Sequence, residues 1–313
     1  MIRLIAARLG QMAVTLAILS ACAYGLIGLM PGDPIDLAIA ADPRLTAEDA
    51  ARLRALHGLD QPLLARYFAW AVMVGSGEFG FSRLFAQPVA SVLGPALVST
   101  LILLGCALAL AAGVGIALGA LAALRPRLAP AVDAVAVLGQ AMPSFWLGIL
   151  LIILFAVTLG WLPAGGTPDG GGALAALRYL ALPVATLAIA NLAAYARHAA
   201  ASLTNALNDP WIRSARARGA SERIVLWRHA LPNAAVPLLQ VAALDAGALV
   251  GGALVTETVF ARPGMGKLIY DAVMGNDYNL ALIALLLVAL VTMLATLAAD
   301  LAQRVLDPRL TDA

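Results

Sequence analysis

The chain has 313 residues, of which 62% are hydrophobic and 12% are charged, and its mean hydropathy is +0.90. Soluble domains are about half apolar and about a quarter charged, so this composition excludes an ordinary soluble protein. The formal net charge of +2 is too small to indicate a nucleic-acid-binding protein. Cys22 and Cys106 lie within apolar runs and indicate neither a disulfide nor a metal site.

Six apolar runs are long enough to cross a hydrocarbon core of about 30 Å, which takes roughly 20 helical residues. The first run resembles a signal peptide, but its length and the lack of a small-residue cleavage site favour a retained span. A backbone in lipid must satisfy its own hydrogen bonds, and the runs do not alternate like barrel strands, so all six are predicted to be α-helical. The predicted spans are approximately residues 9–30, 97–124, 134–161, 179–196, 231–256 and 279–299.

Arginines predict the orientation of these spans. They cluster before the first span, after the second, and between the fourth and fifth, and the positive-inside rule places these three regions in the cytoplasm. Both termini are then cytoplasmic, which agrees with an even number of spans. The clusters are Arg3 and Arg8; Arg125 and Arg127; and Arg197, Arg213, Arg216, Arg218, Arg223 and Arg228.

The first external segment, residues 31–96, is predicted to form a small helical cap. Thr46 and Asp49 resemble a capping box and predict a short helix over residues 47–56. A second helix is expected to start at Pro62 and to end near Gly75. The other external loops, residues 162–178 and 257–278, are rich in Gly and Pro and indicate turns and short helices.

Residues 209–232 form a basic, helix-breaking segment between uncharged runs, and we call it the basic hairpin. Asp209 is expected to cap a helix over residues 211–218 with its side chain, and Pro210 suits the first turn. Gly219 is expected to end that helix in the left-handed conformation. Ser221 then caps a second helix that runs to Leu231.

Arg213 and Arg216 lie one turn apart on the first helix of the basic hairpin, so they share one face. One interpretation is that the arginines only fix the topology and lie on anionic lipid. The alternative is a docking surface for a cytoplasmic partner. A resemblance favours the second: Arg213-Ser214-Ala215, Gly219, and Leu231-Pro232 twelve residues after the glycine resemble the EAA loop of ABC importer permeases. The chain departs from the family pattern with Arg213 in place of Glu and Ser214 in place of Ala.

Further motifs, in the expected order over nearly the whole chain, resemble the dipeptide, oligopeptide and nickel permease family of binding-protein-dependent ABC importers. They are Leu29-Met30-Pro31-Gly32-Asp33-Pro34, Gly58-Leu59-Asp60-Gln61-Pro62-Leu63, Ala215-Arg216-Ala217-Arg218-Gly219, Phe260-Ala261-Arg262-Pro263-Gly264-Met265-Gly266 and Leu306-Asp307-Pro308-Arg309.

The resemblance implies an all-α polytopic protein with six transmembrane helices in the bacterial cytoplasmic (inner) membrane. Its parts would be the N-terminus and first span (1–30), the external cap (31–96) and a permease core (97–313) that contains the coupling loop 209–232. It implies ATPase coupling through Arg213, Ser214, Ala215, Arg216, Arg218, Gly219, Glu222, Leu231 and Pro232, and a face for the binding protein at Pro31, Gly32, Asp33, Pro34, Pro263 and Gly264.

The resemblance also implies partners: a second homologous permease subunit, two cytoplasmic ATPase subunits that bind ATP and Mg²⁺, and an extracytoplasmic binding protein. Arg262 to Lys267 lacks the spacing of a phosphate-binding loop, and the chain has no Walker sequence. We therefore expect no enzyme activity, no cofactor and no metal in this chain, whose contacts otherwise are with membrane lipid and not with nucleic acid.

Asp245 is the charged residue of the predicted spans, and an acid at that depth usually faces a bundle interior or a water-filled cavity. It is the leading candidate for the translocation path, with a structural role at a helix interface as the alternative. An acid there would favour cationic cargo. Weaker candidates are Gln140, Ser144, Asn191 and Gln240, because single polar residues also form interhelical hydrogen bonds.

Glycine and proline positions predict how the spans pack. Gly115 and Gly119, like Gly247 and Gly251, are spaced for close helix approach. Pro143, Pro183 and Pro237 are expected to kink the third, fourth and fifth spans.

Three functional classes are weighed. The leading one is the permease subunit of an ATP-driven importer of di- or oligopeptides, with nickel or glutathione-like cargo as the alternative. An ion-coupled secondary transporter would show internal repeats and several ionisable residues within the spans. An intramembrane enzyme would need catalytic sets at membrane depth, whereas His57, His198 and His229 lie outside the predicted spans.

Overall fold

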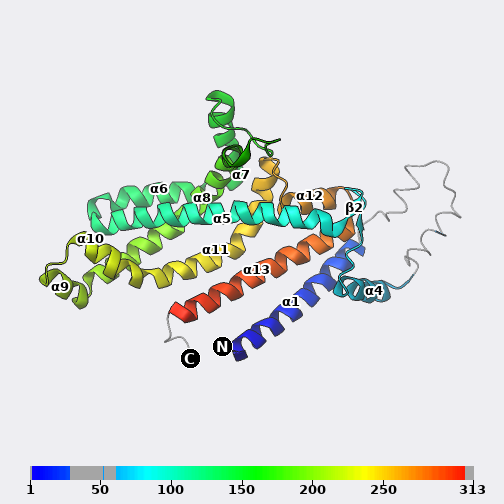
Figure 1. Ribbon diagram of the computed structural model, residues 1–313, viewed down its shortest axis with the longest axis horizontal. Helices are drawn as coiled ribbons and strands as arrows, with labels where there is room; N and C mark the ends of the chain where they lie inside the picture. The colour runs from blue at the N-terminus through cyan, green and yellow to red at the C-terminus, as the bar shows by residue number, and fades with distance from the viewer. Residues whose placement is uncertain (1, 29–51, 53–60, 307–313) are drawn as a thin grey trace. The chain divides into compact units, whose positions relative to one another are not determined.

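The computed structural model describes residues 2–28, 52 and 61–306, and helices make up most of them (Figure 1). The elements are α1 (Ile2–Gly28), α4 (Leu63–Gly75), β1 (Phe81–Ser82), β2 (Gln87–Pro88), α5 (Val89–Leu124), η1 (Pro126–Leu128), α6 (Ala129–Ala141), α7 (Ser144–Leu151), η2 (Ile152–Thr158), α8 (Gly172–Asn208), α9 (Pro210–Ala217), α10 (Glu222–Ile224), η3 (Val225–Ala230), α11 (Leu231–Val259), α12 (Met265–Met274) and α13 (Tyr278–Leu306).

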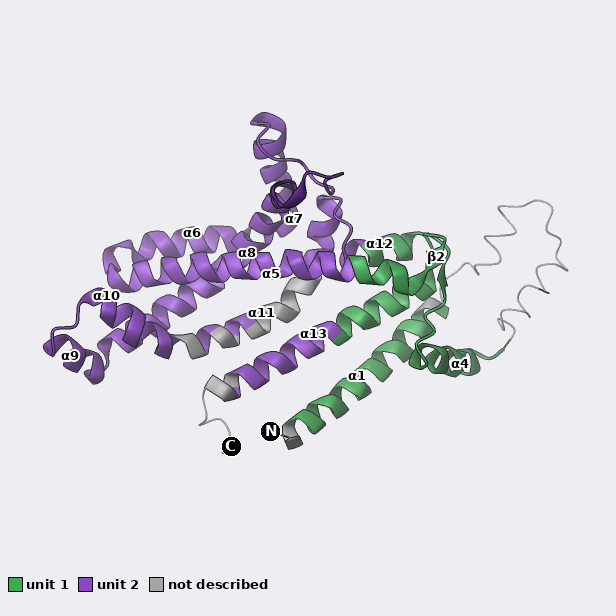
Figure 2. Cartoon of the chain, viewed as in Figure 1, with its two compact units in different colours: residues 1–95, 268–290 green, residues 96–267, 291–313 purple. Residues whose placement is uncertain are grey.

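Contacts divide the chain into two compact units (Figure 2). Unit 1 comprises Met1–Pro95 and Leu268–Leu290, and unit 2 comprises Ala96–Lys267 and Val291–Ala313. The long helices α5 and α13 each contribute residues to both units.

Four of the predicted spans coincide with helices that are long and apolar enough to cross a membrane. These are Ile5–Leu26 within α1, Val89–Leu124, Gly172–Asn208 and Tyr278–Ala302 within α13. The fifth predicted span lies within α11. The chain is therefore an all-α, polytopic membrane protein.

The third predicted span is not one helix. The helical segments 126–141 and 144–158 meet at an angle of 100°. Proline is the cause: Pro143 cannot donate a backbone hydrogen bond, and Met142 before it adopts an extended conformation with φ −84° and ψ 129°. The predicted kink is thus a complete break, and α6 and α7 are separate helices.

Two glycines in the C-terminal part of α5 allow α5 and α8 to pack closely, as predicted. A Cβ added to Gly115 would lie 2.5 Å from the Cβ of Tyr195, and one added to Gly119 would lie 2.5 Å from the Cβ of Ala199. Helices α6 and α11 also pack against α8. Since α7, α9 and η3 contact it as well, α8 is the central helix of unit 2.

In unit 1, α4 packs against α1 through aromatic residues. The hydroxyl groups of Ser20 and Tyr67 are hydrogen-bonded at 2.9 Å, and the indole of Trp70 donates to Asn279 at 3.1 Å. The short β1–β2 hairpin is held by Asp277, whose carboxylate accepts from the hydroxyl of Ser82 at 2.6 Å. The predicted helix from Pro62 to Gly75 is confirmed as α4, whereas the predicted helix 47–56 lies outside the described residues.

Candidate functional site

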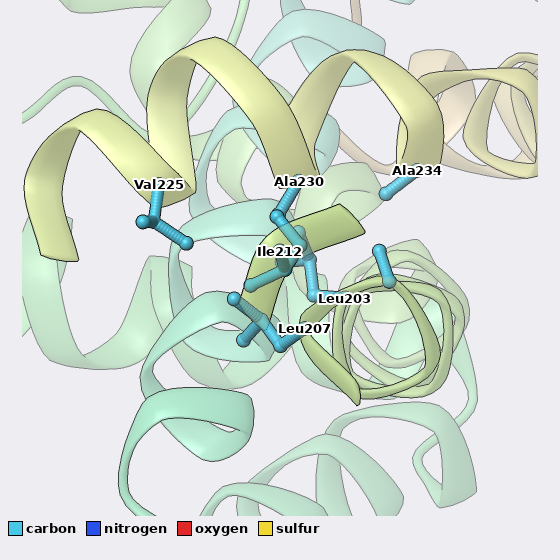
Figure 3. Packing of buried hydrophobic residues seen from close by; sticks show 7 residues of the cluster. Leu203, Leu207, Ile212, Val225, Ala230 and Ala234 are labelled. Atoms are coloured by element: carbon cyan, nitrogen blue, oxygen red, sulfur yellow. The ribbon is translucent and has the colours of Figure 1, made fainter. Parts of the chain in front are cut away.

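The basic hairpin folds around a buried apolar cluster in unit 2 (Figure 3). Ile212 of α9, Val225 of η3 and Leu203 of α8 are all fully buried in it. In α9 the buried residues are Ile212 and Ala215, three positions apart, so the helix directs one face to the cluster and the other outward. The cluster therefore fixes α9 and η3 against the end of α8. Its members are Leu203, Ala206, Leu207, Ile212, Val225, Ala230 and Ala234.

The turn between the two helical parts of the basic hairpin depends on Gly219. Its φ is +84°, a left-handed conformation that costs other residues about 1–2 kcal/mol. Its amide donates to the carbonyl of Arg216 at 2.9 Å. No atom lies within 4 Å of the position that a Cβ would take, so the conformation alone calls for glycine here.

An ion pair spans this turn. The guanidinium of Arg216 donates to both carboxylate oxygens of Glu222, at 2.7 and 2.9 Å. This hydrogen bonding lowers the pKa of Glu222 and raises that of Arg216. Both side chains are exposed, so the pair adds little stability. It does offset the negative charge of the Glu222 carboxylate.

Asp209 and Ser221 occupy the predicted helix-cap positions, but the predicted capping by their side chains is wrong. Asp209 precedes α9, but its side chain makes no capping hydrogen bond and instead accepts from the indole of Trp211 at 3.1 Å. Ser221 occupies the cap position of α10 without a side-chain capping bond. In both cases the backbone carbonyl accepts the first helical bond, from Ile212 at 3.1 Å and from Val225 at 2.9 Å.

The second part of the basic hairpin runs without interruption into α11. It starts at Glu222, passes through the π-helical segment η3 and continues from Leu231. Pro232 lies inside this continuous helix, just after η3, and has no amide hydrogen to donate to the preceding turn. The sequence did not predict the π-helical segment, which widens the helix just before α11.

The outward face of the basic hairpin is cationic. The side chains of Arg213, Ser214, Arg216 and Arg218 are exposed, as are those of Arg223 and Arg228. Among the described residues, only Arg216 of these arginines has an ion-pair partner. Trp211 lies edge-on to His229, with ring centroids 6.3 Å apart, so the start of α9 contacts η3.

Helix α8 is longer than a membrane span and leads into the basic hairpin. It has 37 residues, which span about 55 Å, against a hydrocarbon core of about 30 Å. The predicted fourth span ended at Ala196, but the helix passes through Pro183 and continues to Asn208, since residues 197–208 contain no Pro or Gly. Figure 1 shows α9 and α10 together at this end of α8.

No hydrogen bond joins the three candidate path residues whose side chains are described, Gln140, Ser144 and Asn191. Gln140 accepts from the guanidinium of Arg197 at 2.6 Å, and Asn191 donates to the carbonyl of Leu187 within its own helix at 2.8 Å. Ser144 begins α7, directly after the break. The side chains of Asp245 and Gln240 on α11 lie outside those described.

A buried carboxylate at the other end of α11 was not predicted. Glu257 is fully buried and accepts from the hydroxyl of Thr100 at 2.5 Å and from the amides of Gly266 and Lys267 at 2.8 and 3.2 Å. Thr100 in turn accepts from the amide of Met265 at 2.8 Å. Together they satisfy the first three amides of α12, which have no helical partners.

Of the residues assigned to a binding-protein face, the described ones are Pro263, which is exposed, and Gly264, which is buried. A Cβ at Gly264 would overlap the carboxylate of Glu257, so glycine is required for that close approach. Pro31, Gly32, Asp33 and Pro34 lie outside the described residues. No group of three or more His, Cys, Asp or Glu able to hold a metal occurs in the described part of the chain.

A helical membrane protein with an exposed basic hairpin and no Walker sequence has the features of a transporter's membrane subunit. Residues 115–312 match the family "Binding-protein-dependent transport system inner membrane component", and residues 1–91 match the corresponding N-terminal family. The chain belongs to this family and is a multi-pass permease subunit of the inner membrane, not an enzyme.

Relatives match over almost their full length. The chain is 34% identical to a putative peptide permease of Brucella ovis over 92% of both chains, and 35% identical to a probable peptide ABC transporter permease of Sinorhizobium fredii over 97% of both. It is 30% identical to the oligopeptide transport system permease AppB of Bacillus subtilis over 90% of both. The inward-facing MetNI methionine ABC transporter has the same fold, with a TM-score of 0.58 and 21% identity over 70% of this chain and 98% of that one.

Proposed function

We propose that this chain passes di- or oligopeptides, delivered by an extracytoplasmic binding protein, across the inner membrane, and that the basic hairpin docks on partner ATPases. The hairpin carries the proposal: its buried cluster joins it to α8 and α11, while its arginines remain exposed. The names of the relatives support peptides over nickel or glutathione-like cargo.

The full transporter would contain a second homologous permease subunit and two ATPase subunits, which bind ATP and Mg²⁺. We place both termini and the basic hairpin in the cytoplasm, following the arginine distribution. The proposed coupling residues are Arg213, Ser214, Ala215, Arg216, Arg218, Gly219, Glu222, Leu231 and Pro232.

Within unit 2, a displacement of the basic hairpin would reach the membrane helices directly. Ile212 and Val225 share the buried cluster with residues of α8 and α11, so α9 cannot shift without disturbing both helices. Closure of the ATPase pair on ATP would move the hairpin and reorient the helices from inward-facing to outward-facing. We assign the lining of the translocation path to Asp245, Asn191, Gln240, Gln140 and Ser144, and the binding-protein face to Pro31, Gly32, Asp33, Pro34, Pro263 and Gly264.

The coupling proposal is tested at Gly219. Gly219→Pro cannot adopt φ +84° and removes the amide that donates to Arg216, so the turn must rearrange. We expect the assembled transporter in proteoliposomes to lose ATP hydrolysis stimulated by the binding protein. Gly160→Pro is the matched control, because Gly160 also has a positive φ, +64°, but follows η2 far from the hairpin. Full stimulation in the Gly219 variant would reject coupling through the hairpin, and peptide uptake without ATP would favour a secondary transporter.

The path proposal is tested at Asp245. If its carboxylate faces the path, Asp245→Asn should reduce uptake of peptides with a net positive charge more than uptake of neutral peptides. Asn191→Ala serves as a comparison that removes a polar group without changing charge. Equal uptake of cationic and neutral peptides before and after the Asp245 change would remove Asp245 from the path.

A further inference from the structure

Unit 1 contains a cavity of about 550 Å³ between four of its helical segments. The walls are residues of α1, of α4, of the start of α5 and of the first half of α13, all of which belong to this unit (Figure 2). A Cβ added to the lining residue Gly75 would meet no neighbouring atom of the described residues within 4 Å, so there is free space at that wall. Small-ligand pockets measure about 300–1,000 Å³, so the cavity is large enough for a ligand.

The cavity lies at the depth of the hydrocarbon core. Three of its walls, α1, α5 and α13, contain segments long and apolar enough to cross a membrane. The lining residue Leu290 is at the middle of the segment Tyr278–Ala302, and the lining residue Leu16 is at the middle of Ile5–Leu26. The middle of a membrane-spanning helix lies near the middle of the bilayer. The cavity is therefore surrounded by lipid chains and not by water.

The polar groups in the wall are already satisfied. Among the described lining residues, only Ser20, Tyr67 and Trp70 have polar side chains. The hydroxyl groups of Ser20 and Tyr67 are hydrogen-bonded to each other at 2.9 Å, and the indole of Trp70 donates to Asn279 at 3.1 Å. These bonds also hold α4 to α1 and to the start of α13. The surface left for an occupant is apolar.

This chemistry separates the possible occupants. A buried water molecule needs about two to four polar partners, and a peptide needs partners for its backbone amides and carbonyls. The wall offers neither a free set of such partners. An acyl chain needs none, and it gains the dispersion contacts that an empty space of this size would lack. The cavity therefore suits an acyl chain and does not suit peptide cargo.

Exposed apolar residues bring lipid chains next to the cavity. On α4, Leu64, Phe68 and Val72 are spaced four residues apart on one face and are 71%, 64% and 73% exposed. On α1, Val14 and Ile18 are also four residues apart and are 60% and 59% exposed. Apolar faces of this kind on a membrane protein are covered by an apolar medium. Bilayer lipid thus has access to both helices that flank the cavity.

We propose that this cavity binds one acyl chain of a membrane phospholipid, which fills the space between α1, α4 and α13. The bound chain packs under α4, a helix of 13 residues that is too short to cross the bilayer by itself. The lipid would then be a resident part of unit 1, in addition to the peptide that the transporter moves.

The test uses the assembled transporter, reconstituted with a zwitterionic phospholipid that carries a photoreactive group on one acyl chain. We expect illumination to attach this lipid to residues 283–290 of α13. Ala71→Phe and Ala17→Phe fill the cavity from two different helices, and each should lower the adduct yield about tenfold or more, because the added ring takes the place of the chain. The controls are Ala69→Phe and Ala13→Phe, which place the same ring at exposed positions of the same helices outside the cavity.

An unchanged yield in the two filling variants, or an equal loss in the controls, would overturn the inference. A photoreactive amino acid in place of the lining residue Leu287 identifies the occupant of the unfilled cavity, so it decides the question even where a filling variant does not assemble. An adduct with phospholipid supports the inference. Any result without one, including a crosslink to the second permease subunit or within this chain, rejects it. Peptide uptake is not measured, so a failure of the proposed function leaves this test intact.

Discussion

Arginine, glycine and glutamate residues occur near both ends of α11, but they are exposed at one end and buried at the other. Before α11, the basic hairpin holds arginines, Gly219 and Glu222, and its charged groups point outward. At its other end α11 carries Glu257, and the loop to α12 holds Arg262 and Gly264; all three are buried. At the first end the carboxylate pairs with an exposed arginine, and at the second it satisfies backbone amides.

Burial therefore decides what a charged residue does at each end. Glu257 cannot be removed without leaving the amides of Gly266 and Lys267 unsatisfied in the interior, which carries a large cost. Arg213 can be removed with little effect on folding, because its side chain is exposed. The end with exposed charges suits recognition of a partner, and the end with buried charges holds the loop in one conformation.

The largest expected effect is that of removing Glu257. Glu257→Ala takes away an acceptor for two amides and the Thr100 hydroxyl, and we expect it to destabilise the protein by about 3 kcal/mol or more. Thermal unfolding of the purified protein in detergent measures it. Glu222→Ala is the control at the other end of α11, with an expected change below about 1 kcal/mol. Equal losses for the two variants would contradict the assignment of a structural role to one end only.

Replacing Gly264 should destabilise the protein more than replacing Gly219, because Gly264 is buried and Gly219 is exposed. A Cβ at Gly264 overlaps the Glu257 carboxylate, so Gly264→Ala should cost about 2–3 kcal/mol through overpacking. Gly219 has open space around it, so Gly219→Ala should cost only the left-handed conformation, about 1–2 kcal/mol. The ranking is measured by thermal unfolding, and a larger loss for Gly219→Ala would reverse the comparison.

Arginine replacements should separate function from stability. Arg213→Ala is expected to leave the unfolding temperature unchanged and to lower the affinity of the ATPase pair several-fold, as for an interface charge. Arg262→Ala, at the buried end, should lower the unfolding temperature because its side chain packs in the interior. A destabilised Arg213 variant with normal ATPase affinity would be incompatible with an exposed docking surface.

The smallest expected effect concerns pH. Hydrogen bonding to Arg216 lowers the pKa of Glu222 in the folded state, so the pair stabilises the protein above the unfolded pKa of about 4.3 and loses this contribution as pH falls through the folded value. The unfolding temperatures of the unaltered protein and Glu222→Gln should differ slightly at pH 7 and converge at strongly acidic pH. A difference that grows on acidification would show that the pair has the opposite linkage.

Local signals allowed much of this fold to be predicted. Apolar run length located α1, α5, α8 and α13, and Pro62 and Gly219 marked a helix start and a turn because their effects act within a few residues. The 100° break at Pro143 exceeded the expected kink, since a proline signals an interruption but not its angle.

Features that depend on contacts between distant parts of the chain could not be predicted from the sequence. Glu257 meets Thr100 across 157 positions in the chain, so nothing near either residue indicates the contact. The exposure of Trp227 could not be predicted without knowing that Val225 and Ala230 are buried against α8. Asp209 has the residue type of a helix cap, but the neighbouring Trp211 offers its carboxylate another donor.

Photo-crosslinking from position 213 tests the docking of the basic hairpin most directly. A photoreactive amino acid replaces Arg213 in the full transporter in proteoliposomes, with the same substitution at the exposed Trp161 as the control. The account predicts an adduct with the ATPase subunit from position 213 and none from position 161. Adducts from position 213 with lipid alone, or with neither lipid nor ATPase, would contradict it.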